Sequence, residues 1–495
     1  MKKHIAWMLA VLLLAIACMG AGCKHNETLP DDTVENPSGS EDGTSSDLYA
    51  DDLPDTLDDY DGKIFRMLVG DGGGGTNYIT EDPGIRETVL TRNVYQSTVA
   101  LEDRFGIRLD YTGMDANASG YIAFMQEIRN TNVAGGNEIY DVVSPAYWYG
   151  MVLAAEGQFQ DLNQVRYIDF SKPYWTAGFN NTTELFGIRY AAVGDFCLGN
   201  ITSLCMIAFN TELISSRQMT SPFTHFENNT WTLDTMFGMA AEMYEDLNAD
   251  NASSVGDMVG LIASSQTVDA FFPSSGFHIV EANGNELELT KYSEPAENLY
   301  QMLRSRFYGN DSFLFANDQP TVIQEFTNGH ALFAATCIDR IITLRSMQGD
   351  YGLIVYPKFD SSQQNYVTGT AGTAVLAIPN AVTTPDCSGL VLEALCASFY
   401  QSVRPAYIGV ILEGQAAKDP TSAEMINLAI DTVYWDFGFV NHNALGAIAE
   451  FSSKMAQYDT FRGWYDSFER VYEGKISNYL KTYNKGDGGN ADTGA

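Results

Sequence analysis

The sequence predicts an α/β fold built on parallel sheets, and three features of the chain support this class. Apolar runs at 331–335 and 351–356 flank a helical segment that begins near Ile338. Strand, helix and strand in this order form a βαβ unit, which implies a parallel sheet. Further buried strands, separated by amphipathic helices, are predicted at 63–69, 107–111 and 140–144. The length of 495 residues is enough for two domains.

The charge of the chain excludes one large class of partners. The formal net charge is −35, with 63 acidic residues against 28 Lys and Arg. Proteins that bind nucleic acid neutralise phosphates with Lys and Arg, so a nucleic-acid partner is not expected. The acidic surplus is typical of a soluble, self-repelling protein outside the cytoplasm.

The N-terminal residues 1–22 have the pattern of an export signal. Lys2 and Lys3 precede an uninterrupted apolar run from Ile5 to Cys18, which is too short to span a bilayer comfortably. The following Met-Gly-Ala-Gly-Cys resembles a bacterial lipobox with Cys23 as the lipidated residue, and Cys18 is the competing site. No other stretch is long and apolar enough to cross a membrane. We therefore expect an exported protein, lipid-anchored to the outer face of the cytoplasmic membrane.

Two segments are expected to lack stable structure. Residues 23–60 are rich in Asp, Glu, Ser and Pro and contain almost no large apolar side chains, which predicts a flexible spacer. Residues 485–495 are rich in Gly, Asp and Asn and are expected to be disordered. The folded body should therefore extend from residue 61 to residue 484.

Five cysteines follow Cys23, and none of them has the spacing of a redox or metal motif. Buried free thiols are expected, and one disulfide is left open. The five are Cys197, Cys205, Cys337, Cys387 and Cys396.

Candidate ligand residues follow the predicted strands of the first half. Asp71 opens a glycine run after the first strand, at the edge where open α/β sheets bind ligands. Tyr147, Trp148 and Tyr149 follow the strand at 140–144. Flat aromatic faces cover the C–H patches of sugars, so these three residues are candidates for sugar binding, with Trp148 first among them. The alternative is that two of the rings only pack the edge of the sheet.

The segment from Asp246 to Asp257 has the spacing of a calcium-binding loop. Oxygen-bearing side chains stand at loop positions 1, 3, 5, 9 and 12, and a backbone carbonyl is available at position 7. Asn251 replaces the usual glycine, and Asp257 replaces the longer Glu. A weak structural calcium site is one reading, and an acidic loop at a helix end is the other. The candidate ligands are Asp246, Asn248, Asp250, Ala252, Ser254 and Asp257.

Several motifs in this order resemble the extracellular solute-binding proteins of the family-1 type, the maltose and oligosaccharide receptors of ABC importers. They are Gly157-x-x-x-Asp161-Leu162, Gly187-Ile188-Arg189-Tyr190 leading to Asp195, Trp231-Thr232, Phe326-x-x-Gly329-x-Ala331, and Asp350-Tyr351-Gly352 followed by Tyr356-Pro357-Lys358. Each motif is loose, and the resemblance depends on their joint order and spacing. It covers most of residues 63–450.

The resemblance implies a two-lobed, periplasmic-binding-protein-like fold of type II, in which each lobe is a mainly parallel sheet flanked by helices and a hinge joins the lobes. It assigns 61–190 and 326–370 to the first lobe, and 191–325 and 371–484 to the second. It places the first crossing between lobes at 187–195, so Asp195 is a candidate ligand contact. Trp231 is a further candidate, either packed in the core or facing the cleft.

The function implied by the resemblance is that of a receptor, not an enzyme. Such a protein closes on its ligand and delivers it to an ABC permease as a monomer, with no cofactor required. A carbohydrate is the expected ligand, while a peptide or a polyamine stays open. The alternatives are a secreted carbohydrate-active enzyme, which needs a suitably spaced pair of carboxylates, and a tethered sensor or adhesin on the same fold.

Overall fold

The computed structural model describes residues 51–54, 62–71, 88–116, 120–133, 139–290 and 293–485. All of them lie within one compact unit of the chain, Leu48–Ala495. The predicted signal segment at 1–22, including Cys18, lies outside the described residues. So do Cys23, most of the spacer and the tail beyond residue 485.

The first lobe is organised around a parallel sheet with the strand order β2-β1-β3. Its strands are β1 (Ile64–Asp71), β2 (Arg108–Asp115) and β3 (Val142–Ser144). These strands confirm the three that the sequence predicts in this region. The accompanying helices are α2 (Val89–Phe105), α3 (Tyr121–Val133), α4 (Tyr147–Ala155), η4 (Leu162–Gln164) and α5 (Ala177–Thr183).

Residues 51–54 correct the predicted end of the spacer. Arg104 at the end of α2 donates to the Asp51 carboxylate at 2.6 Å and to the Leu53 carbonyl at 3.1 Å. The Asp51 side chain is buried by these contacts. The folded body therefore begins before residue 61, because a buried ion pair attaches the end of the acidic segment to α2.

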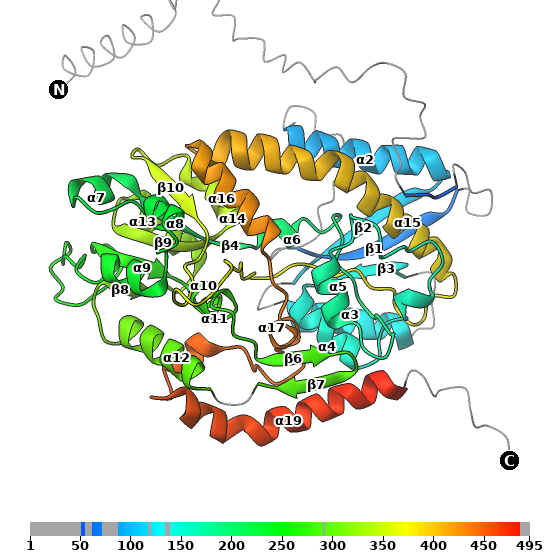
Figure 1. The fold of residues 1–495 in the computed structure, drawn as a ribbon. Helices are drawn as coiled ribbons and strands as arrows, with labels where there is room; N and C mark the ends of the chain where they lie inside the picture. The colour runs from blue at the N-terminus through cyan, green and yellow to red at the C-terminus, as the bar shows by residue number, and fades with distance from the viewer. Residues whose placement is uncertain are drawn as a thin grey trace, which may run out of the picture. The chain divides into compact units, whose positions relative to one another are not determined.

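The second lobe contains a five-stranded sheet with the order β10-β4-β9-β5-β8, which lies on the left in Figure 1. Strand β4 runs antiparallel to both of its neighbours, whereas β9, β5 and β8 run parallel to one another. The strands are β4 (Cys205–Asn210), β5 (Val259–Ala263), β8 (Phe313–Phe315), β9 (Ala331–Cys337) and β10 (Tyr351–Ile354). A separate hairpin consists of β6 (Val280–Asn283) and β7 (Glu286–Leu289).

Helices cover the second sheet and connect its strands. Helix α13 packs on β9 and β5, α14 on β9, α9 on β5 and α12 on β8. The helices of this region are α6 (Gly199–Thr202), α7 (Thr211–Ser216), α8 (Pro222–Glu227), α9 (Leu233–Ala240), α10 (Ser265–Asp269), α11 (Phe271–Ser274), α12 (Glu294–Phe307), α13 (Gln319–Thr327) and α14 (Ile338–Leu344).

The βαβ unit is present as β9-α14-β10, but its assignment to the first lobe is wrong. Both strands pair with β4, which lies between them, and β9 also pairs with β5. Conversely, residues 374–379 were expected in the second lobe but bridge to the first sheet, for example Ala377 to Val143. A strand's own sequence predicts its burial and not its partner, so these lobe assignments needed the three-dimensional pairing.

Three extended segments connect the lobes, and they are hydrogen-bonded to one another. The Cys205 amide donates to the Gly369 carbonyl at 2.9 Å, and Ala371 donates to Ser203 at 2.8 Å. The segment around Thr368 also pairs with the third segment, since the Thr368 amide donates to the Thr432 carbonyl at 3.0 Å. The crossing predicted at 187–195 therefore comes later, since Ala192 still bridges to Leu376 beside the first sheet.

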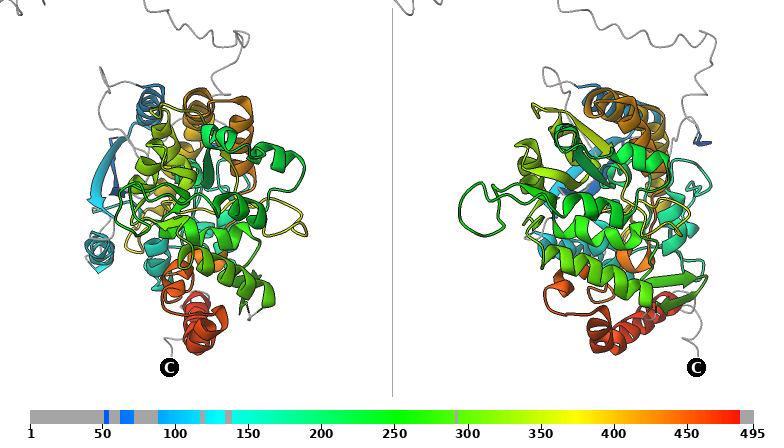
Figure 2. Two further views of the ribbon diagram at one scale, coloured as in Figure 1. Left: turned by 90° about the vertical axis from the view of Figure 1, so that its left-hand side faces the viewer. Right: turned by 60° about the vertical axis from the view of Figure 1, so that its left-hand side comes forward.

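A long helical run also passes from one lobe to the other. Helix α15 packs against α2 of the first lobe, and η6 packs against α14 and α16 of the second. Figures 1 and 2 show this run beside α2. The C-terminal elements are α15 (Pro385–Ser398), η5 (Phe399–Val403), η6 (Ala406–Ala416), α16 (Pro420–Asp431), α17 (Phe437–Val440), α18 (Phe451–Met455) and α19 (Phe461–Lys485).

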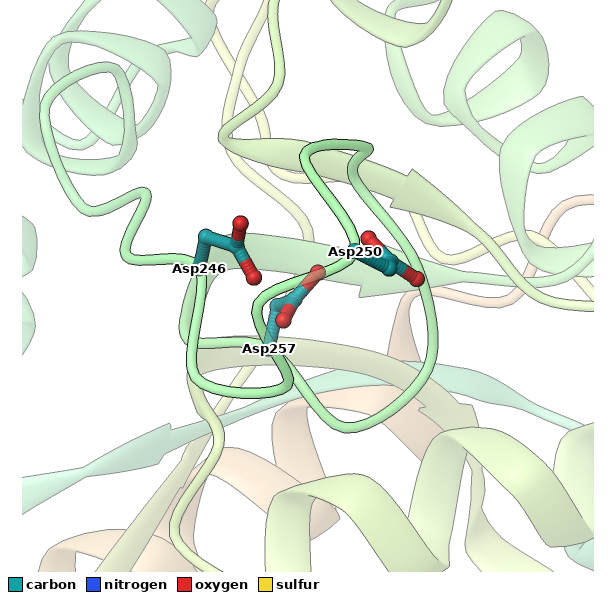
Figure 3. A group of neighbouring side chains, drawn as sticks. All are labelled: Asp246, Asp250 and Asp257. Carbon is teal, nitrogen blue, oxygen red and sulfur yellow. The ribbon is translucent and has the colours of Figure 1, made fainter.

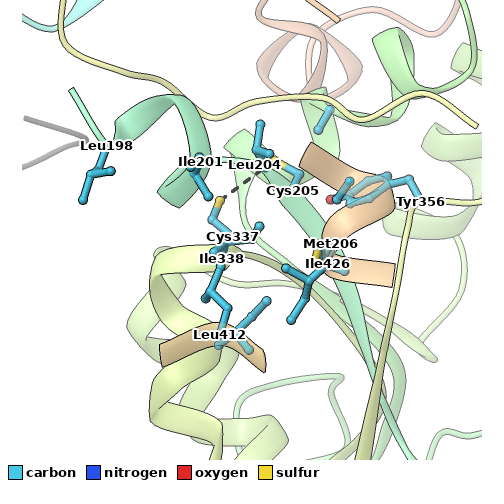
Figure 4. Close-up of a cluster of buried hydrophobic side chains, with 14 of the residues drawn as sticks. Leu198, Ile201, Leu204, Cys205, Met206, Cys337, Ile338, Tyr356, Leu412 and Ile426 are labelled. Atoms are coloured by element: carbon cyan, nitrogen blue, oxygen red, sulfur yellow. Dashed lines mark hydrogen bonds between the residues drawn. The ribbon is translucent and has the colours of Figure 1, made fainter. Parts of the chain in front are cut away.

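The five cysteines after Cys23 are all buried and free, as expected. Cys205 on β4 faces Cys337 on β9 across the sheet, with 3.9 Å between the sulfur atoms (Figure 4). Apolar side chains from η6 and α16, including Leu412 and Ile426, belong to the same cluster. The thiols therefore act as core groups, in keeping with the absence of a metal or redox spacing.

Candidate ligand site between the two lobes

The candidate site lies where several strands end. Helix α4 follows β3 in the first lobe, and α10 follows β5 in the second. Residues 316–320 and 338–340 follow β8 and β9 at the same end of the second sheet. The carboxyl ends of parallel strands are the usual binding edge of open α/β sheets. In this chain the ends of strands from both lobes line a pair of adjoining cavities.

The first of these cavities, named here the aromatic chamber, has a volume of about 540 Å³. It receives side chains from α4, from α10, from the crossing at 370–371 and from the segment 439–450. This volume lies in the ordinary range for a small-ligand site. The lining residues are Ala116, Tyr147, Trp148, Tyr149, Gln266, Asp269, Ala270, Thr370, Ala371, Phe439, His442, Asn443, Ala449 and Glu450.

The second cavity, the polar chamber, has a volume of about 380 Å³. It shares Trp148, Gln266 and Ala371 with the aromatic chamber, so the two adjoin at these residues. Hydroxyl, amide and carboxylate groups dominate its lining. The residues that line only this chamber are Ser203, Ser264, Ser265, Asn317, Asp318, Gln319, Pro320, Cys337, Asp339 and Arg340.

Trp148 stands at the junction of the two chambers, in the first turn of α4. Its indole approaches the backbone of Gly372 so closely that a Cβ atom there would lie 2.6 Å from ring atom Cζ3. The Gly372 φ of +146° is a further reason for glycine at this crossing. Trp148 is half-buried, so part of its ring stays available to a ligand. The structure therefore brings the leading sequence candidate into the cavity.

The two neighbouring tyrosines also line the aromatic chamber, but they are more involved in packing. Tyr149 stacks on Tyr121 with ring centroids 4.1 Å apart and an interplanar angle of 2°. Tyr147 is buried, and burial raises the pKa of its hydroxyl group. Trp148 makes an edge contact with Tyr149 at 6.2 Å. These packed rings fix the indole in place, which leaves Trp148 as the platform for a ligand.

The electrostatic character of the aromatic chamber comes from Asp269 and Glu450. Asp269, at the end of α10, accepts hydrogen bonds from the Ser452 amide at 2.6 Å and from its hydroxyl at 3.1 Å. Burial, with a smaller contribution from Glu450, raises the pKa of Asp269 to about 7. Burial lowers the pKa of His442, so this imidazole is neutral at pH 7.

Three other sequence candidates do not line either chamber. Asp71 is the exposed last residue of β1 and is paired in register with Asp115. Asp195 is buried, and its carboxylate accepts from Arg404 and Asn200, each at 2.9 Å. Trp231 is completely buried, and its indole nitrogen donates to the Val355 carbonyl at 2.9 Å. Asp195 and Trp231 are therefore structural residues of the two lobes.

The calcium-like loop between α9 and β5 brings its carboxylates together, as Figure 3 shows. Asp246, Asp250 and Asp257 each place a carboxylate oxygen within 4.8 Å of the others. Asn251 has a φ of +60°, so it takes the left-handed conformation expected of the residue that replaces glycine. Asn248 and Ser254 lie in the same loop and are joined by a hydrogen bond of 2.8 Å. Oxygen donors of this kind suit a hard cation.

Sequence reasoning missed the contributions of the second lobe and of the C-terminal segment. Gln266 and Asp269 could have been found, because a polar stretch follows the buried run at 259–263, the same signal that indicated residues 147–149. His442 and Glu450 lie on turns around α17 and α18 and have no distinctive local pattern. Their position in the cavity depends on the crossing at 432–434, which precedes them in the chain.

Comparison with solved structures finds proteins with a similar fold. An ABC substrate-binding protein of Listeria monocytogenes, Lmo0181 in complex with cycloalternan, is 14% identical, with a TM-score of 0.52 over 86% of this chain and 100% of its own. A cyclo/maltodextrin-binding protein complexed with maltotetraose is 11% identical, with a TM-score of 0.53 over 87% and 98% of the two chains. The GacH receptor of Streptomyces glaucescens, whose structures include an acarbose complex, is 12% identical, with a TM-score of 0.51 over 86% and 98%.

The chain therefore has the two-lobed, type II periplasmic-binding-protein-like fold that the motifs predicted. The resemblance to family-1 solute-binding proteins extends from short motifs to the architecture of the lobes. No protein-family model matches the sequence, and no curated protein matches it either. In the described ranges, no helix is both long and apolar enough to cross a membrane.

Proposed function

We propose that this protein is a solute-binding receptor that takes a carbohydrate into the cavity between its lobes. The observation that carries the proposal is the position of Trp148, an available aromatic face between a chamber of rings and a chamber of hydroxyl and amide groups. Sugars need both kinds of surface, because their C–H faces pack on rings while their hydroxyls form hydrogen bonds. The carbohydrate complexes of proteins with the same fold support this choice of ligand.

Binding is coupled to closure of the lobes about the three crossings. A ligand in the aromatic chamber touches α4 of the first lobe and α10 of the second at the same time. Such a ligand makes more contacts when the lobes are closed than when they are open. The difference in binding free energy between the two arrangements stabilises the closed one. The paired backbones at 203–205, 368–371 and 432–434 keep the crossings together while the lobes move.

Delivery of the ligand to an ABC permease, from a lipid anchor at Cys23, completes the proposed role. These two steps are supported by the lipobox-like motif and by the resemblance to importer receptors. A sensor with the same anchor and the same cavity would lack the permease. Co-purification of a permease with the membrane-bound protein distinguishes the two roles.

A structural cation, calcium by preference, is proposed for the loop at 246–257. The convergence of three carboxylates and the presence of Asn248 and Ser254 support it, since Ca²⁺ takes six to eight oxygen ligands. The loop precedes β5, whose far end carries α10 and the cavity lining. The cation would therefore stabilise the second lobe without touching the solute.

A thermal-shift screen tests the proposed ligand class. The compact unit 48–495 is exposed to neutral oligosaccharides, polyamines and short peptides, and the stabilising compounds are titrated by calorimetry. We expect oligosaccharides to raise the melting temperature. Trp148→Ala should weaken their binding by at least about tenfold, while Tyr95→Ala, which removes a half-buried ring from α2 away from the cavity, should not. Stabilisation by peptides alone, or release of shortened sugar products, would refute the proposal.

A further inference from the structure

The aromatic chamber is acidic, and none of the described residues that line it is a Lys or an Arg. Its lining contains the carboxylates of Asp269 and Glu450. The imidazole of His442 is neutral at pH 7 because burial lowers its pKa. With both carboxylates ionised, the described lining would carry two negative charges and no positive charge.

Neither carboxylate is neutralised by a cation within the part of the chain that the structure describes. Asp269 accepts hydrogen bonds from Ser452, and Glu450 accepts one from the Ser453 hydroxyl at 3.3 Å. Both side chains are half-buried, and a charge that is partly removed from water without a counter-charge is costly. The pKa of Asp269, raised to about 7, reflects this cost. A positive charge brought by the ligand would offset it and favour the ionised carboxylate.

The aromatic side chains of the same chamber also suit a cation. Trp148 and Tyr149 on α4 and Phe439 on α17 line the cavity together with the two carboxylates. The faces of such rings attract ammonium groups, most strongly where water is displaced. A site with several rings and two carboxylates therefore offers two independent attractions for a protonated amine.

The polar chamber contains the one described arginine of the combined lining, Arg340. Its Nε atom lies 3.1 Å from an Asp339 carboxylate oxygen, so its charge is already paired. Asp318 adds a further carboxylate to this chamber, and its oxygen accepts from the Thr321 amide at 2.8 Å. The polar chamber therefore does not reverse the acidic character of the site, and it remains suited to hydroxyl groups.

We propose that the solute is an amino sugar, bound with its ammonium group between the Asp269 and Glu450 carboxylates and the aromatic wall of Trp148. This inference rests on the proposed function, because it specifies the class of carbohydrate that the same cavity binds. The sugar rings extend over the indole toward the hydroxyl and amide groups of the polar chamber. Neutral sugars lose the attraction to the carboxylates, and anionic sugars are repelled by them.

The test uses two trisaccharides that differ at the nitrogen atoms. Chitotriose carries amines, whereas N,N′,N″-triacetylchitotriose has the same backbone and no charge. Binding of each to the compact unit 48–495 is measured by calorimetry at pH 7, with maltotriose and spermidine as further probes. We expect chitotriose to bind at least about tenfold more tightly than its acetylated form, given the strength of charge-assisted contacts.

Substitutions of the two carboxylates test whether Glu450 and Asp269 cause the preference for chitotriose. Glu450→Gln should weaken chitotriose binding by about tenfold or more and weaken maltotriose binding by a much smaller factor. Asp269→Asn should act in the same direction, and its amide oxygen can still accept from Ser452. Glu424→Gln, an exposed carboxylate on α16, is the matched control and should leave both affinities unchanged.

The outcomes separate this inference from the proposed function. Equal or tighter binding of maltotriose or the acetylated sugar overturns the inference and leaves the receptor function standing. Binding of spermidine without any saccharide overturns the amino-sugar assignment in favour of a polyamine. If none of the three saccharides binds, both the inference and the carbohydrate-receptor proposal fail.

Discussion

Gly372 determines where Trp148 can lie, because the indole packs directly on its backbone. In Gly372→Ala the new methyl group would lie 2.6 Å from the ring, and alanine would be strained at a φ of +146°. We expect the ring to be displaced from the junction of the chambers. Saccharide affinity should fall by about tenfold or more, and the free energy of unfolding should fall by roughly 1–3 kcal/mol.

Gly238→Ala is the matched control for this substitution. Gly238 lies in α9, where an added Cβ meets nothing within 4 Å. Alanine there should leave binding unchanged and stabilise the helix slightly. If Gly372→Ala binds saccharide as well as the parent protein in calorimetry, the indole is not held in place by this contact.

Glu393 gives the first lobe a pH-dependent stability. Its buried carboxylate in α15 accepts from the Tyr174 hydroxyl at 2.6 Å, the Trp175 indole at 2.9 Å and the Asp169 amide at 3.1 Å. Burial outweighs these bonds and raises the pKa to about 7, from an ordinary value of 4.5. Between these two pH values the folded protein holds a proton that the unfolded chain has released. Raising the pH through this interval therefore lowers stability, by on the order of 3 kcal/mol from this group.

Glu393→Gln should remove this contribution. Glutamine resembles the protonated acid, with its oxygen toward the two N–H donors and its amide toward the Tyr174 hydroxyl. We expect the variant to match the parent protein at pH 5 and to exceed its stability at pH 8. Urea unfolding at both values measures the difference, and Glu424→Gln on the exposed face of α16 is the control. A variant less stable than the parent at pH 8 contradicts the assigned pKa.

At the scale of elements, the loop before β5 is the most direct test of metal dependence. Adding calcium to chelator-treated protein should raise the melting temperature, by an amount that grows with the ion concentration. Asp250→Asn removes an exposed carboxylate of the cluster and should abolish this response. Asp103→Asn, an exposed carboxylate on α2, should not. An equal calcium response in the two variants would exclude the loop as the binding site.

Elements with strong local signals were predictable from the sequence. Helix α2 is one of the amphipathic helices expected between the predicted strands, and it begins after the capping residue Thr88 and ends at Gly106 in the left-handed conformation. Asn210 and Thr232 likewise begin α7 and α9 by accepting backbone hydrogen bonds. Periodicity and capping are local properties of the chain, so they can be read without the fold.

Helix α4 shows what a local reading misses. Its N-terminal residue Ala146 provides no side-chain cap, and its sequence is apolar on nearly all sides. Local signals therefore indicate aromatic residues after a strand and do not indicate a helix. Trp148 nevertheless lines the cavity. Residues that follow the carboxyl end of a strand lie at the binding edge of the sheet, whether they form a helix or a loop.

At the scale of the whole described unit, the pairing of distant segments could not be read from the sequence. Strand β4 enters the second sheet from a crossing and inserts between β9 and β10 in the opposite direction. Nothing in the apolar run 205–210 distinguishes that position from another buried strand. The site shares this limitation, since Asp269 and Glu450 line one cavity only because the chain crosses between the lobes again at 432–434.

Hydrogen–deuterium exchange on the compact unit 48–495 tests the central claim, that a saccharide binds between the lobes and holds both. The probe is the saccharide that gives the largest thermal shift in the screen. We predict slower exchange in three separate stretches, α4 at 147–155, α10 and α11 at 265–274, and the segment 437–455. Trp148→Ala should remove all three effects together. Protection confined to one lobe, or located away from the two chambers, would contradict the account.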